Sequence, residues 1–405
     1  MPNIVIIGAG AAGLMAAIWA GRTKPNRNII LLDGARKLGA KILVSGGGRC
    51  NVTNFKVDAL DYAGGSPNAI QKVLRRFGVT HTIDFFRQLG VELKQEETGK
   101  LFPVSNSAKT VLNALLTAAS AANVIINYPC RVQHITHLDG KFHVSGEWGE
   151  IIAEQVILAT GGQSLPKSGS DGLGYQLARS VGHQITPRIL PALVPLLLPS
   201  NHFICKLSGL TLPATLELRG KQGEKIIAFT NSTLCTHFGL SGPSVLDISR
   251  YYLNSKLDDA NTTLTINWWP DKHREALDKE LQNLNRLTLL RYLHQQLPER
   301  LARALCQAAG LEPDMPGYLL TRQQRKLLTQ FVTALPLPII GDRGFSVAEV
   351  TAGGVPLTEI NLNTMASRIC PALYLCGEIC DVDGRIGGFN FQWAWASGYL
   401  AGISI

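Results

Sequence analysis

Short apolar runs near the start of the chain predict buried strands. Residues 4–7 and 29–32 are two such runs, and the stretch 14–20 between them is apolar over the length of a helix. Runs of four apolar residues bounded by turn residues are typical of strands that are covered on both faces. The order strand, helix, strand predicts the start of a nucleotide-binding α/β fold.

The pattern changes twice further along the chain. Up to about residue 185 helical and strand-like stretches alternate, then short β-rich runs with five prolines follow, and leucines at helical spacing fill 271–334. The expected elements are helices and a hairpin over 66–108, a helix over 110–122, strands within 124–146 and at 155–159, a helix within 169–182 that Asp171 caps, and strands at 193–198, 214–219, 225–230, 262–268 and 345–351.

The last segment repeats the pattern of the first. An apolar strand at 373–376 runs into Gly377 and Glu378, and Gly387 and Gly388 precede an aromatic, Ala-rich helix. Glycine-rich turns between a strand and a helix at both ends of the chain indicate that it leaves a nucleotide-binding domain and later returns to it. We therefore expect an α/β protein in which a Rossmann-like domain is interrupted by a β-rich and a helical subdomain, with boundaries at 1–188, 189–270, 271–341 and 342–405.

The first turn carries the chemistry of dinucleotide binding. Gly8, Gly10 and Gly13 form a Gly-x-Gly-x-x-Gly motif, in which backbone amides at a helix N-terminus can face a pyrophosphate. Asp33 follows 20 residues after Gly13, where a carboxylate accepts the ribose hydroxyls. An acid there disfavours a 2′-phosphate, so FAD or NAD is expected rather than NADP. The alternative is that these glycines are needed only for the packing of the turn between the strand and the helix.

Composition is that of an ordinary cytoplasmic enzyme. The chain has 405 residues, 45% of them hydrophobic, and no apolar run of 18 or more residues, so we expect no membrane span. Its start runs straight into a strand without a secretory pattern. The eight cysteines include no C-x-x-C pair, which favours reduced thiols and no metal site.

The formal charge of +9 is unevenly distributed. Residues 1–50 hold seven basic side chains against the single acid Asp33, and some of that excess is expected to face cofactor phosphates. Residues 286–326 hold another seven basic side chains against three acids. On helices such a stretch is usually a solvated face; the other interpretation is a surface for a polyanion such as RNA.

Four sequence blocks resemble one known family. The blocks SGGGRCNVTN at 45–54, THFGLSGPSVL at 236–246, EVTAGGV at 349–355 and the segment 377–398 are similar to the signature blocks of a bacterial FAD-binding family. That family includes aminoacetone oxidases, bile-acid 4,6-reductases and a ribosomal-RNA dihydrouridine synthase. The resemblance covers essentially the whole chain and implies an FAD domain interrupted by a β subdomain and a helical subdomain.

The resemblance also implies roles for particular residues. Gly46 to Gly48 would let the backbone pass close to the flavin and the pyrophosphate, Arg49 would offset negative charge, and Asp381 would bind the ribityl or pyrophosphate region. The helix amides at 387–390 would lie at the flavin N1/O2 edge. The residues expected to bind the cofactor are Gly8, Gly10, Ala11, Ala12, Gly13, Asp33, Gly34, Lys41, Ser45, Gly46, Gly47, Gly48, Arg49, Asn51, Thr160, Gly161, Gly377, Glu378, Asp381, Gly387, Gly388, Phe389 and Asn390.

Two residues are candidates for proton transfer to a substrate. Cys50 lies next to Arg49 in the loop expected over the flavin, although a small buried thiol that fills space is an equal alternative. His237 precedes the turn Ser241 to Pro243 in the β subdomain expected to cover the flavin, and its alternative is a structural histidine. Glu378 could be a base or could hold backbone amides.

The sequence leaves the reaction open among three hypotheses. The first is a reductase that passes flavin hydride to an activated C=C bond, in a small molecule or in uracil of ribosomal RNA. The second is an amine oxidase that uses oxygen, and the third is an RNA-binding protein with a structural flavin. The segment 169–178 lacks the context of a second dinucleotide motif, so NAD(P)H is expected to visit the flavin transiently, if it is the donor. Substrate and oligomeric state are not predicted.

Overall fold

The computed structural model describes residues 4–405 and divides into two compact units. One unit runs to Pro191 and resumes at Ala348, and the other spans Ala192–Val347. The chain therefore leaves its first unit and returns to it, as an α/β fold with a Rossmann-like part and an inserted part. The boundaries expected at 188, 270 and 341 stay a prediction.

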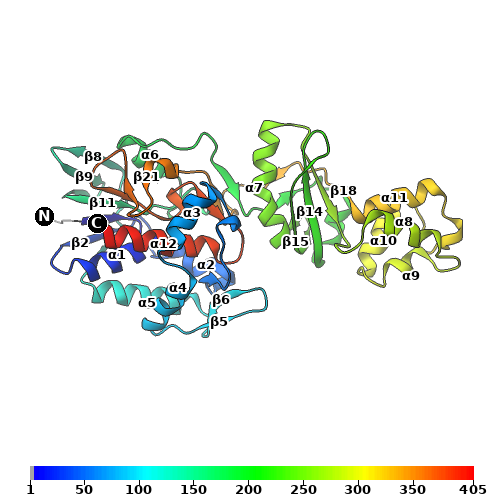
Figure 1. Cartoon of the computed structure of the whole chain (residues 1–405), viewed down its shortest axis with the longest axis horizontal. Coiled ribbons are helices and arrows are strands. Elements are labelled where there is room, and N and C mark those ends of the chain that lie inside the picture. Colours follow the sequence, from blue (N-terminus) through cyan, green and yellow to red (C-terminus); the bar gives the residue numbers. More distant parts are fainter. Residues whose placement is uncertain (1–3) are drawn as a thin grey trace. The chain divides into compact units, whose positions relative to one another are not determined.

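A seven-stranded sheet forms the centre of the first unit (Figure 1). Five of its strands are parallel in the order β7, β2, β1, β11, β23, and the edge strands β22 and β21 are antiparallel. The central strand β1 is almost fully buried, which explains its uninterrupted apolar run. The strands are β1 (Ile4–Ile7), β2 (Ile29–Leu32), β7 (Ile125–Asn127), β11 (Gln155–Leu158), β21 (Ile360–Asn361), β22 (Ala366–Ser367) and β23 (Leu373–Leu375).

The first and last helices of the chain pack against each other beside this sheet (Figure 1). They are α1 (Ala11–Thr23) and α12 (Phe389–Ser404). A Cβ added to Gly398 would lie 2.5 Å from the backbone oxygen of Ala12, and one added to Gly402 would lie 2.4 Å from that of Ala16. The small residues one turn apart on α12 thus permit a close crossing, which joins the two ends of the sequence in one core.

Smaller elements complete the first unit. Many of its smaller strands form three antiparallel groups. The expected hairpin is confirmed and consists of β5 and β6. These elements are α2 (Ala40–Gly48), β3 (Thr53–Asn54), β4 (Tyr62–Gly64), α3 (Pro67–Leu74), α4 (Val79–Gln88), β5 (Leu93–Gln95), β6 (Lys100–Pro103), α5 (Ala108–Ala121), β8 (His134–Leu138), β9 (Lys141–Gly146), β10 (Gly149–Ala153), α6 (Leu173–Ser180), β20 (Val350–Ala352) and β24 (Val382–Gly384).

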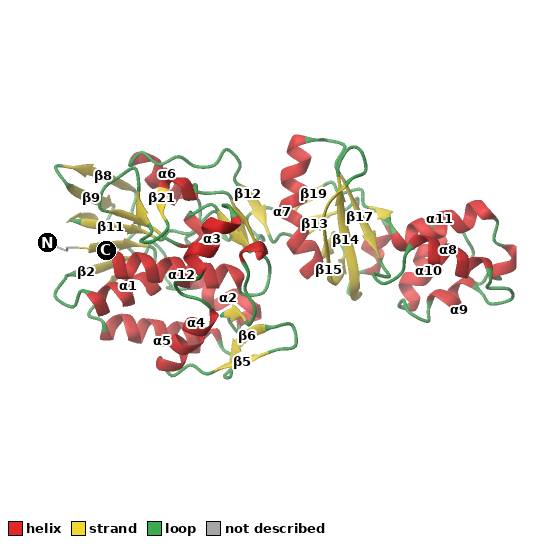
Figure 2. Cartoon of the chain, viewed as in Figure 1, coloured by secondary structure: helices red, strands yellow, loops and turns green. Residues whose placement is uncertain are grey.

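The second unit is built on an antiparallel sheet, with one long helix on one side and a group of helices gathered on the other (Figure 2). Its strand order is β18, β17, β14, β15, β16, β13, β19, and α7 (Pro243–Asp258) packs on β14 and β15. The strands are β13 (Leu196–Leu197), β14 (Thr211–Arg219), β15 (Lys225–Thr236), β16 (Gly239–Ser241), β17 (Thr263–Asn267), β18 (Leu335–Pro336) and β19 (Gly341–Asp342).

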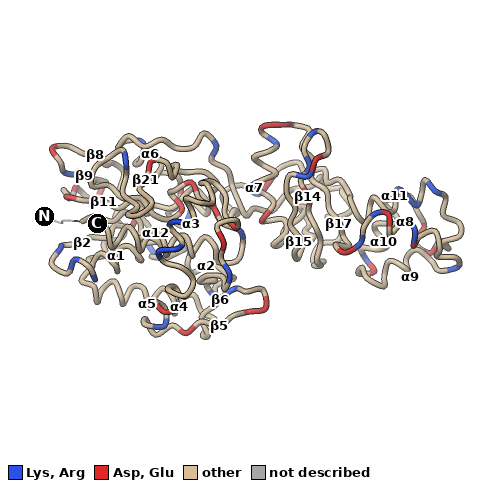
Figure 3. Tube along the Cα trace, viewed as in Figure 1, with Lys and Arg blue, Asp and Glu red and all other residues tan. Residues whose placement is uncertain are grey.

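Four helices follow β17, as the leucine spacing predicts. They are α8 (Arg274–Gln282), α9 (Leu289–Leu293), α10 (Glu299–Ala308) and α11 (Arg322–Thr333). One hydrophobic core contains residues of both the sheet and the helices, for example Trp268 and Leu305. Lys and Arg residues are frequent on these four helices (Figure 3). Among the described residues no helix is long and apolar enough to cross a membrane.

Three local expectations need correction. The strand expected at 345–351 is shorter, because a turn closed by the Val347 to Gly344 hydrogen bond precedes β20. Gly172, not Asp171, is the N-cap of α6, and Asp171 accepts a hydrogen bond from the Leu173 amide at 3.2 Å. The loop expected at 45–51 begins as the continuation of α2, which loses helical backbone geometry from Ser45.

Candidate cofactor site

The ends of three parallel strands bring the predicted cofactor residues together. Ile7 is in register with Leu158 of β11, and Leu158 is in register with Leu375 of β23. The carboxyl ends of parallel strands lie at one edge of the sheet, where open α/β folds bind ligands. The segments that follow the three strands therefore meet at this edge, and they hold Gly8 to Gly13, Thr160 and Gly161, and Gly377 and Glu378.

The three glycines of the first turn have different structural reasons. A Cβ at Gly8 would lie 2.4 Å from the backbone oxygen of Ala159, and one at Gly13 would lie 1.8 Å from the backbone oxygen of Gly8. Both are thus required for packing. Gly10 is different, since a Cβ there would meet no atom within 4 Å. Gly10 is also the N-cap of α1 and has no side-chain cap, so the first helix amides, including those of Ala11 and Ala12, have no side-chain partner there.

Asp33 links the end of β2 to this turn. Its Oδ2 accepts a hydrogen bond from the Ala9 amide at 2.7 Å, and its Oδ1 accepts one from the Ala35 amide at 2.7 Å. A carboxylate oxygen can accept more than one hydrogen bond, so both oxygens keep capacity for a ligand hydroxyl. The exposed Gly34 beside it lies close to Arg131, because an added Cβ would lie 3.0 Å from the Cβ of Arg131.

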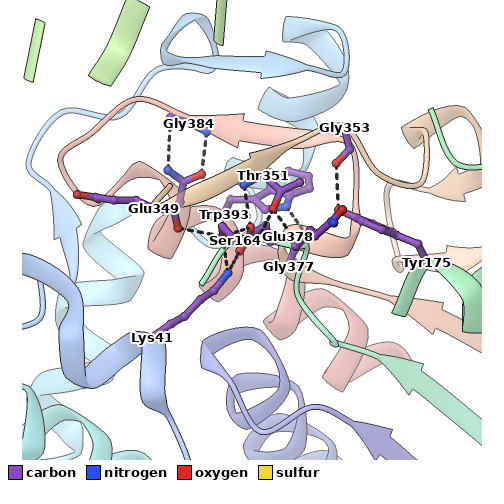
Figure 4. A network of polar contacts seen from close by, with 12 residues as sticks. Lys41, Ser164, Tyr175, Glu349, Thr351, Gly353, Gly377, Glu378, Gly384 and Trp393 are labelled. Atoms are coloured by element: carbon purple, nitrogen blue, oxygen red, sulfur yellow. Dashed lines mark hydrogen bonds and ion pairs between the residues drawn. The ribbon is translucent and has the colours of Figure 1, made fainter. Parts of the chain in front are cut away.

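A polar network around Glu378 joins four segments of the sheet edge (Figure 4). Glu378 Oε2 pairs with Lys41 Nζ of α2 at 2.7 Å. Its Oε1 accepts hydrogen bonds from Ser164 Oγ at 3.0 Å and from the Thr351 amide at 2.9 Å. Lys41 Nζ also donates to Ser164 Oγ at 2.8 Å. The geometry thus favours the interpretation in which Glu378 holds a backbone amide, together with a lysine and a serine.

Ser164 and Thr351 belong to this network, and sequence reasoning missed them. Ser164 is fully buried, and the Thr351 hydroxyl accepts hydrogen bonds from the amides of Gln163 and Ser164 at 2.7 and 2.9 Å. The block EVTAGGV contains Thr351, and the glycines at 161 and 162 lie close before Ser164 in sequence. Nothing in either pattern indicates that the two segments meet.

The glycine run at the end of α2 turns the backbone sharply. Gly46, Gly47 and Gly48 all have positive φ angles, of 55°, 68° and 85°. Residues with a side chain rarely adopt this left-handed backbone conformation, which explains why three consecutive glycines occur here. The preceding Ser45 is fixed by a hydrogen bond from its Oγ to the Ile42 oxygen at 2.8 Å. No atom lies within 4 Å of a Cβ added to Gly47, so the run presents open backbone.

Arg49 already has partners within the first unit. Its Nη1 pairs with Glu96 Oε1 at 2.6 Å, and its guanidinium lies 4.0 Å from the centre of the Phe102 ring. Both partners belong to the region of β5 and β6, so this hairpin holds the glycine run in place. Compensation of cofactor charge by Arg49 stays a prediction. The pair with Glu96 already balances part of the positive charge of Arg49.

Cys50 is buried and held in an unusual backbone conformation. Its side chain is 0% exposed, its φ is 63°, and burial raises the pKa of its thiol to about 12. A hydrogen bond from Ser45 acts in the opposite direction on that pKa. The burial favours the alternative in which the thiol fills space, and its role as proton donor stays a prediction. The next residue, Asn51, has a buried Oδ1 without a hydrogen-bond partner among the described residues.

The start of α12 is confirmed at the expected turn. Gly388 is its N-cap with φ 97° and no side-chain cap, and a Cβ there would lie 2.5 Å from the Thr53 backbone. Asn390 fixes the preceding loop, because Nδ2 donates to the Gly384 oxygen and Oδ1 accepts from the Gly384 amide, both at 2.8 Å. Phe389 is buried, and its oxygen accepts a hydrogen bond from the Tyr62 hydroxyl at 2.8 Å. The Phe389 and Asn390 side chains thus support the loop.

Asp381 and Tyr175 lie in the same unit as this loop. The Asp381 backbone amide donates to the Val355 oxygen at 2.8 Å, and its oxygen accepts from the Gly65 amide at 2.9 Å. Gly64 and Gly65 pack against it, since a Cβ at Gly64 would lie 2.3 Å from its oxygen. Burial raises the pKa of Tyr175, and the charge of Glu378 raises it further.

His237 lies in the second unit, apart from the residues described so far in sequence and in unit. It is exposed in the turn between β15 and β16, and its ring lies 5.0 Å from the ring of Phe238 in an edge contact. The described structure thus assigns His237 to a surface turn. Its role as a substrate ligand or acid stays a prediction.

The residues of the sheet edge fit a dinucleotide such as FAD. Two helix N-termini, those of α1 and α12, have glycine N-caps without side-chain caps, and the two helices pack against each other. Such termini favour negative charge. Gly10 and Gly47 leave open space next to backbone, and Asp33 and the buried Asn51 Oδ1 retain acceptor capacity. Within the described residues no group of His, Cys, Asp and Glu could hold a metal ion.

Comparisons with known proteins agree along the whole chain. A family model described as the HI0933-like protein Rossmann domain matches residues 2–404. The 3-dehydro-bile acid delta(4,6)-reductase of Clostridium scindens is 34% identical over 407 residues, which cover 99% of this chain and 98% of that protein. The ribosomal RNA dihydrouridine synthase of Escherichia coli is 33% identical over 400 residues, which cover 98% and 96%.

Solved structures share the fold at low sequence identity. A variant of the Escherichia coli quinol fumarate reductase FrdA superposes with a TM-score of 0.53 at 17% identity, covering 99% of this chain and 69% of that chain. The 3-ketosteroid delta1-dehydrogenase of Sterolibacterium denitrificans superposes with a TM-score of 0.52 at 10% identity, covering 99% and 98%.

Proposed function

Because the chain belongs to the HI0933-like family and is an FAD-dependent oxidoreductase, we propose that it reduces a carbon–carbon double bond conjugated to a carbonyl group. One observation carries this proposal. Two relatives that match nearly the whole chain are named for saturating a double bond, one in a bile acid and one in uridine of ribosomal RNA. In a 3-oxo-4-ene and in uracil alike, a carbonyl activates the bond toward hydride.

The proposed cofactor contacts follow from the sheet edge. The uncapped amides at the start of α1 bind the pyrophosphate, since the helix dipole and free N–H groups both favour an anion there. Asp33 accepts hydrogen bonds from the ribose hydroxyls. It does so with the same two oxygens that accept hydrogen bonds from the amides of Ala9 and Ala35. The Lys41–Glu378 pair keeps the surrounding segments in register, so the amides keep their positions when the ligand binds.

The start of α12 supports the reduced state of the cofactor. FAD supplies hydride from its N5 atom when bound. We assign the amides at 388–390 to the N1/O2 edge of the ring, where the positive end of the helix stabilises the negative charge that reduction adds. Asn390 and Gly384 hold these amides in place, and the left-handed Gly388 allows the helix to begin against Thr53.

Reduction of the double bond also requires a proton. Hydride adds to one carbon, and the other carbon then takes a proton from an acid or from water. The Cys50 thiol keeps its proton at neutral pH because burial raises its pKa to about 12, yet it is fully buried. His237 is exposed and is the second candidate. Activity of the variants Cys50→Ala and His237→Ala separates the two.

A nicotinamide donor is proposed to visit the site only transiently. The segment at 169–174 leads into α6, but a 3-10 turn at Pro166–Ser168 precedes it where a dinucleotide motif requires a strand. NAD(P)H would therefore reduce the flavin from the substrate side and leave before the substrate binds.

The proposal is tested by anaerobic reduction of the flavin, then by anaerobic addition of a substrate, and in a separate sample by exposure to air. The enzyme is reduced with NADH or with NADPH, and the flavin absorbance is recorded. A 3-oxo-4-ene steroid acid or a uridine-containing ribosomal RNA fragment is then added, and reoxidation with formation of the saturated product is the expected result. Reoxidation by air with rapid peroxide formation, and by neither substrate, would instead support an amine oxidase. Mass spectrometry of ribosomal RNA from a strain without this gene decides between the two substrates.

A further inference from the structure

An exposed surface of the second unit combines positive charge with an aromatic ring. We call it the basic aromatic surface, and it consists of Arg286, Tyr318, Leu319, Arg322 and Lys326. The side chains of Tyr318 and Leu319 are 65% and 52% exposed, and the three basic side chains are exposed as well. An exposed tyrosine of this degree among cations is not explained by the packing of the unit.

Backbone hydrogen bonds show that the five residues are neighbours. The Tyr318 amide donates to the oxygen of Asn285 at 2.9 Å, which places Tyr318 next to Arg286. Arg322 begins α11 three residues after Leu319, and Lys326 follows one helical turn later on the same side. The surface has a rigid base, because Gly317 is buried so closely on Leu284 that a Cβ would lie 2.2 Å from its Cβ.

The charges of this surface are not neutralised within the described residues. Other basic side chains of the region are paired, Arg303 with Glu299 at 2.9 Å and Arg325 with Asp278 at 2.7 Å. The described structure contains no ion pair of Arg286, Arg322 or Lys326. Three unpaired cations around one flat ring fit a ligand that offers both negative charge and a planar group.

We propose that the basic aromatic surface binds single-stranded RNA. Arg286, Arg322 and Lys326 contact phosphates, and a base stacks on Tyr318. Each nucleotide of a single-stranded RNA offers one phosphate and one planar base, which matches cations that lie around one exposed ring. The proposal rests on the proposed function, and within it selects an RNA substrate, which this surface would hold outside the site of reduction.

Binding of a labelled oligonucleotide tests the surface directly. The holoenzyme is titrated into a fluorescein-labelled single-stranded RNA of mixed sequence, and anisotropy is followed at several salt concentrations. Three phosphate contacts predict that log affinity falls with log salt with a slope of about −2. The triple variant Arg286→Glu, Arg322→Glu, Lys326→Glu is expected to bind at least roughly tenfold more weakly and to lose most of that slope.

Two further variants exclude simpler explanations. Tyr318→Ala is expected to weaken binding roughly tenfold, while Tyr318→Phe, which keeps the ring, binds as the unaltered protein does. Lys221→Glu, in the exposed turn between β14 and β15, is the control for a change of charge elsewhere on the unit. Equal binding by all variants, or competition by polyglutamate as effective as by unlabelled RNA, would overturn the proposal.

The outcomes also distinguish this surface from the chemistry. If RNA binds through the surface but its uridines are not reduced, the result contradicts RNA as the substrate and supports the surface as a binding site for RNA. If the enzyme reduces a steroid enone normally and binds no RNA, the surface is overturned and the reductase stands. All the exchanged side chains are exposed, so unchanged thermal unfolding is expected and confirms that each variant is folded.

Discussion

Lys41 and Glu378 form an ion pair across 337 residues of sequence, with Nζ and Oε2 2.7 Å apart. Lys41 comes from α2, close to the first turn of the chain, and Glu378 follows the last parallel strand. Ser164 and Thr351, from two other segments, bind the same carboxylate. The pair thus fastens the loops of the sheet edge to each other where the cofactor is proposed to bind.

Removal of this lysine should destabilise the fold more than loss of a surface pair. Lys41→Met leaves the partly buried carboxylate without its cation, so we expect the free energy of unfolding to fall by about 1–3 kcal/mol and FAD to dissociate more readily. Urea unfolding and flavin absorbance after gel filtration measure both effects. Arg27→Met is the control, because the exposed Arg27–Glu154 pair is worth less than about 1 kcal/mol. Equal losses in the two variants would contradict the role of Lys41.

The second and last glycines of the Gly-x-Gly-x-x-Gly motif should separate binding from folding. In Gly13→Ala the new Cβ would lie 1.8 Å from a backbone oxygen, so the loop must move and we expect a loss of about 3 kcal/mol or more. In Gly10→Ala the Cβ meets nothing within 4 Å and φ is −80°, so stability should stay within about 1 kcal/mol. FAD affinity should nevertheless fall roughly tenfold, because the methyl group occupies the proposed pyrophosphate position. Titration of the apoprotein with FAD measures this, and unchanged affinity in Gly10→Ala would exclude that position.

Burial of Cys50 should make stability fall at high pH. Its folded pKa of about 12 exceeds the ordinary value of 9.0, so the unfolded chain loses this proton first as pH rises. The stabilisation is therefore complete below about pH 9 and is lost between pH 9 and 12, with a slope near 1.4 kcal/mol per pH unit for one thiol. Cys235 and Cys306 have raised pKa values of about 12 and add to the slope.

Urea unfolding at pH 7.5, 9 and 10.5 in a reducing buffer measures this dependence. Cys50→Ala should be less stable at pH 7.5 and should show a smaller loss at high pH than the unaltered protein. An unchanged slope in Cys50→Ala would show that the thiol does not titrate in this way.

Loss of the Asn390 amide should loosen the turn before α12. Asn390→Ala removes both hydrogen bonds to Gly384, so we expect a decrease of about 1–2 kcal/mol in stability and a shift of the flavin reduction potential to lower values, since the helix amides lose their fixed positions. Thermal unfolding and a redox titration against a reference dye measure the two quantities. Asn363→Ala, at an exposed position, is the matched control and should change neither.

The sequence predicted those parts of the site that depend on local spacing. Gly8, Gly10, Gly13 and Asp33 were predicted as site residues because a turn, a helix N-terminus and a strand end recur at fixed distances in sequence. Ser164 and Thr351 were not, because serine and threonine carry no signal until the fold places them beside Glu378. Arg49 was expected to face the cofactor, and its pair with Glu96 depends on a hairpin whose position the sequence does not reveal.

The sequence by itself determined the α/β class, the return of the chain to its first unit and the position of the two glycine turns. Each of these depends on hydrophobic periodicity or on backbone conformations that only glycine adopts readily, and both are local properties. The tertiary structure decided which side chains meet at the sheet edge, because contacts such as that of Lys41 with Glu378 join segments hundreds of residues apart. It also decided that Cys50 is buried. It also placed Tyr318 beside Arg286, because a backbone hydrogen bond joins their two segments. The sequence of neither segment indicates that contact.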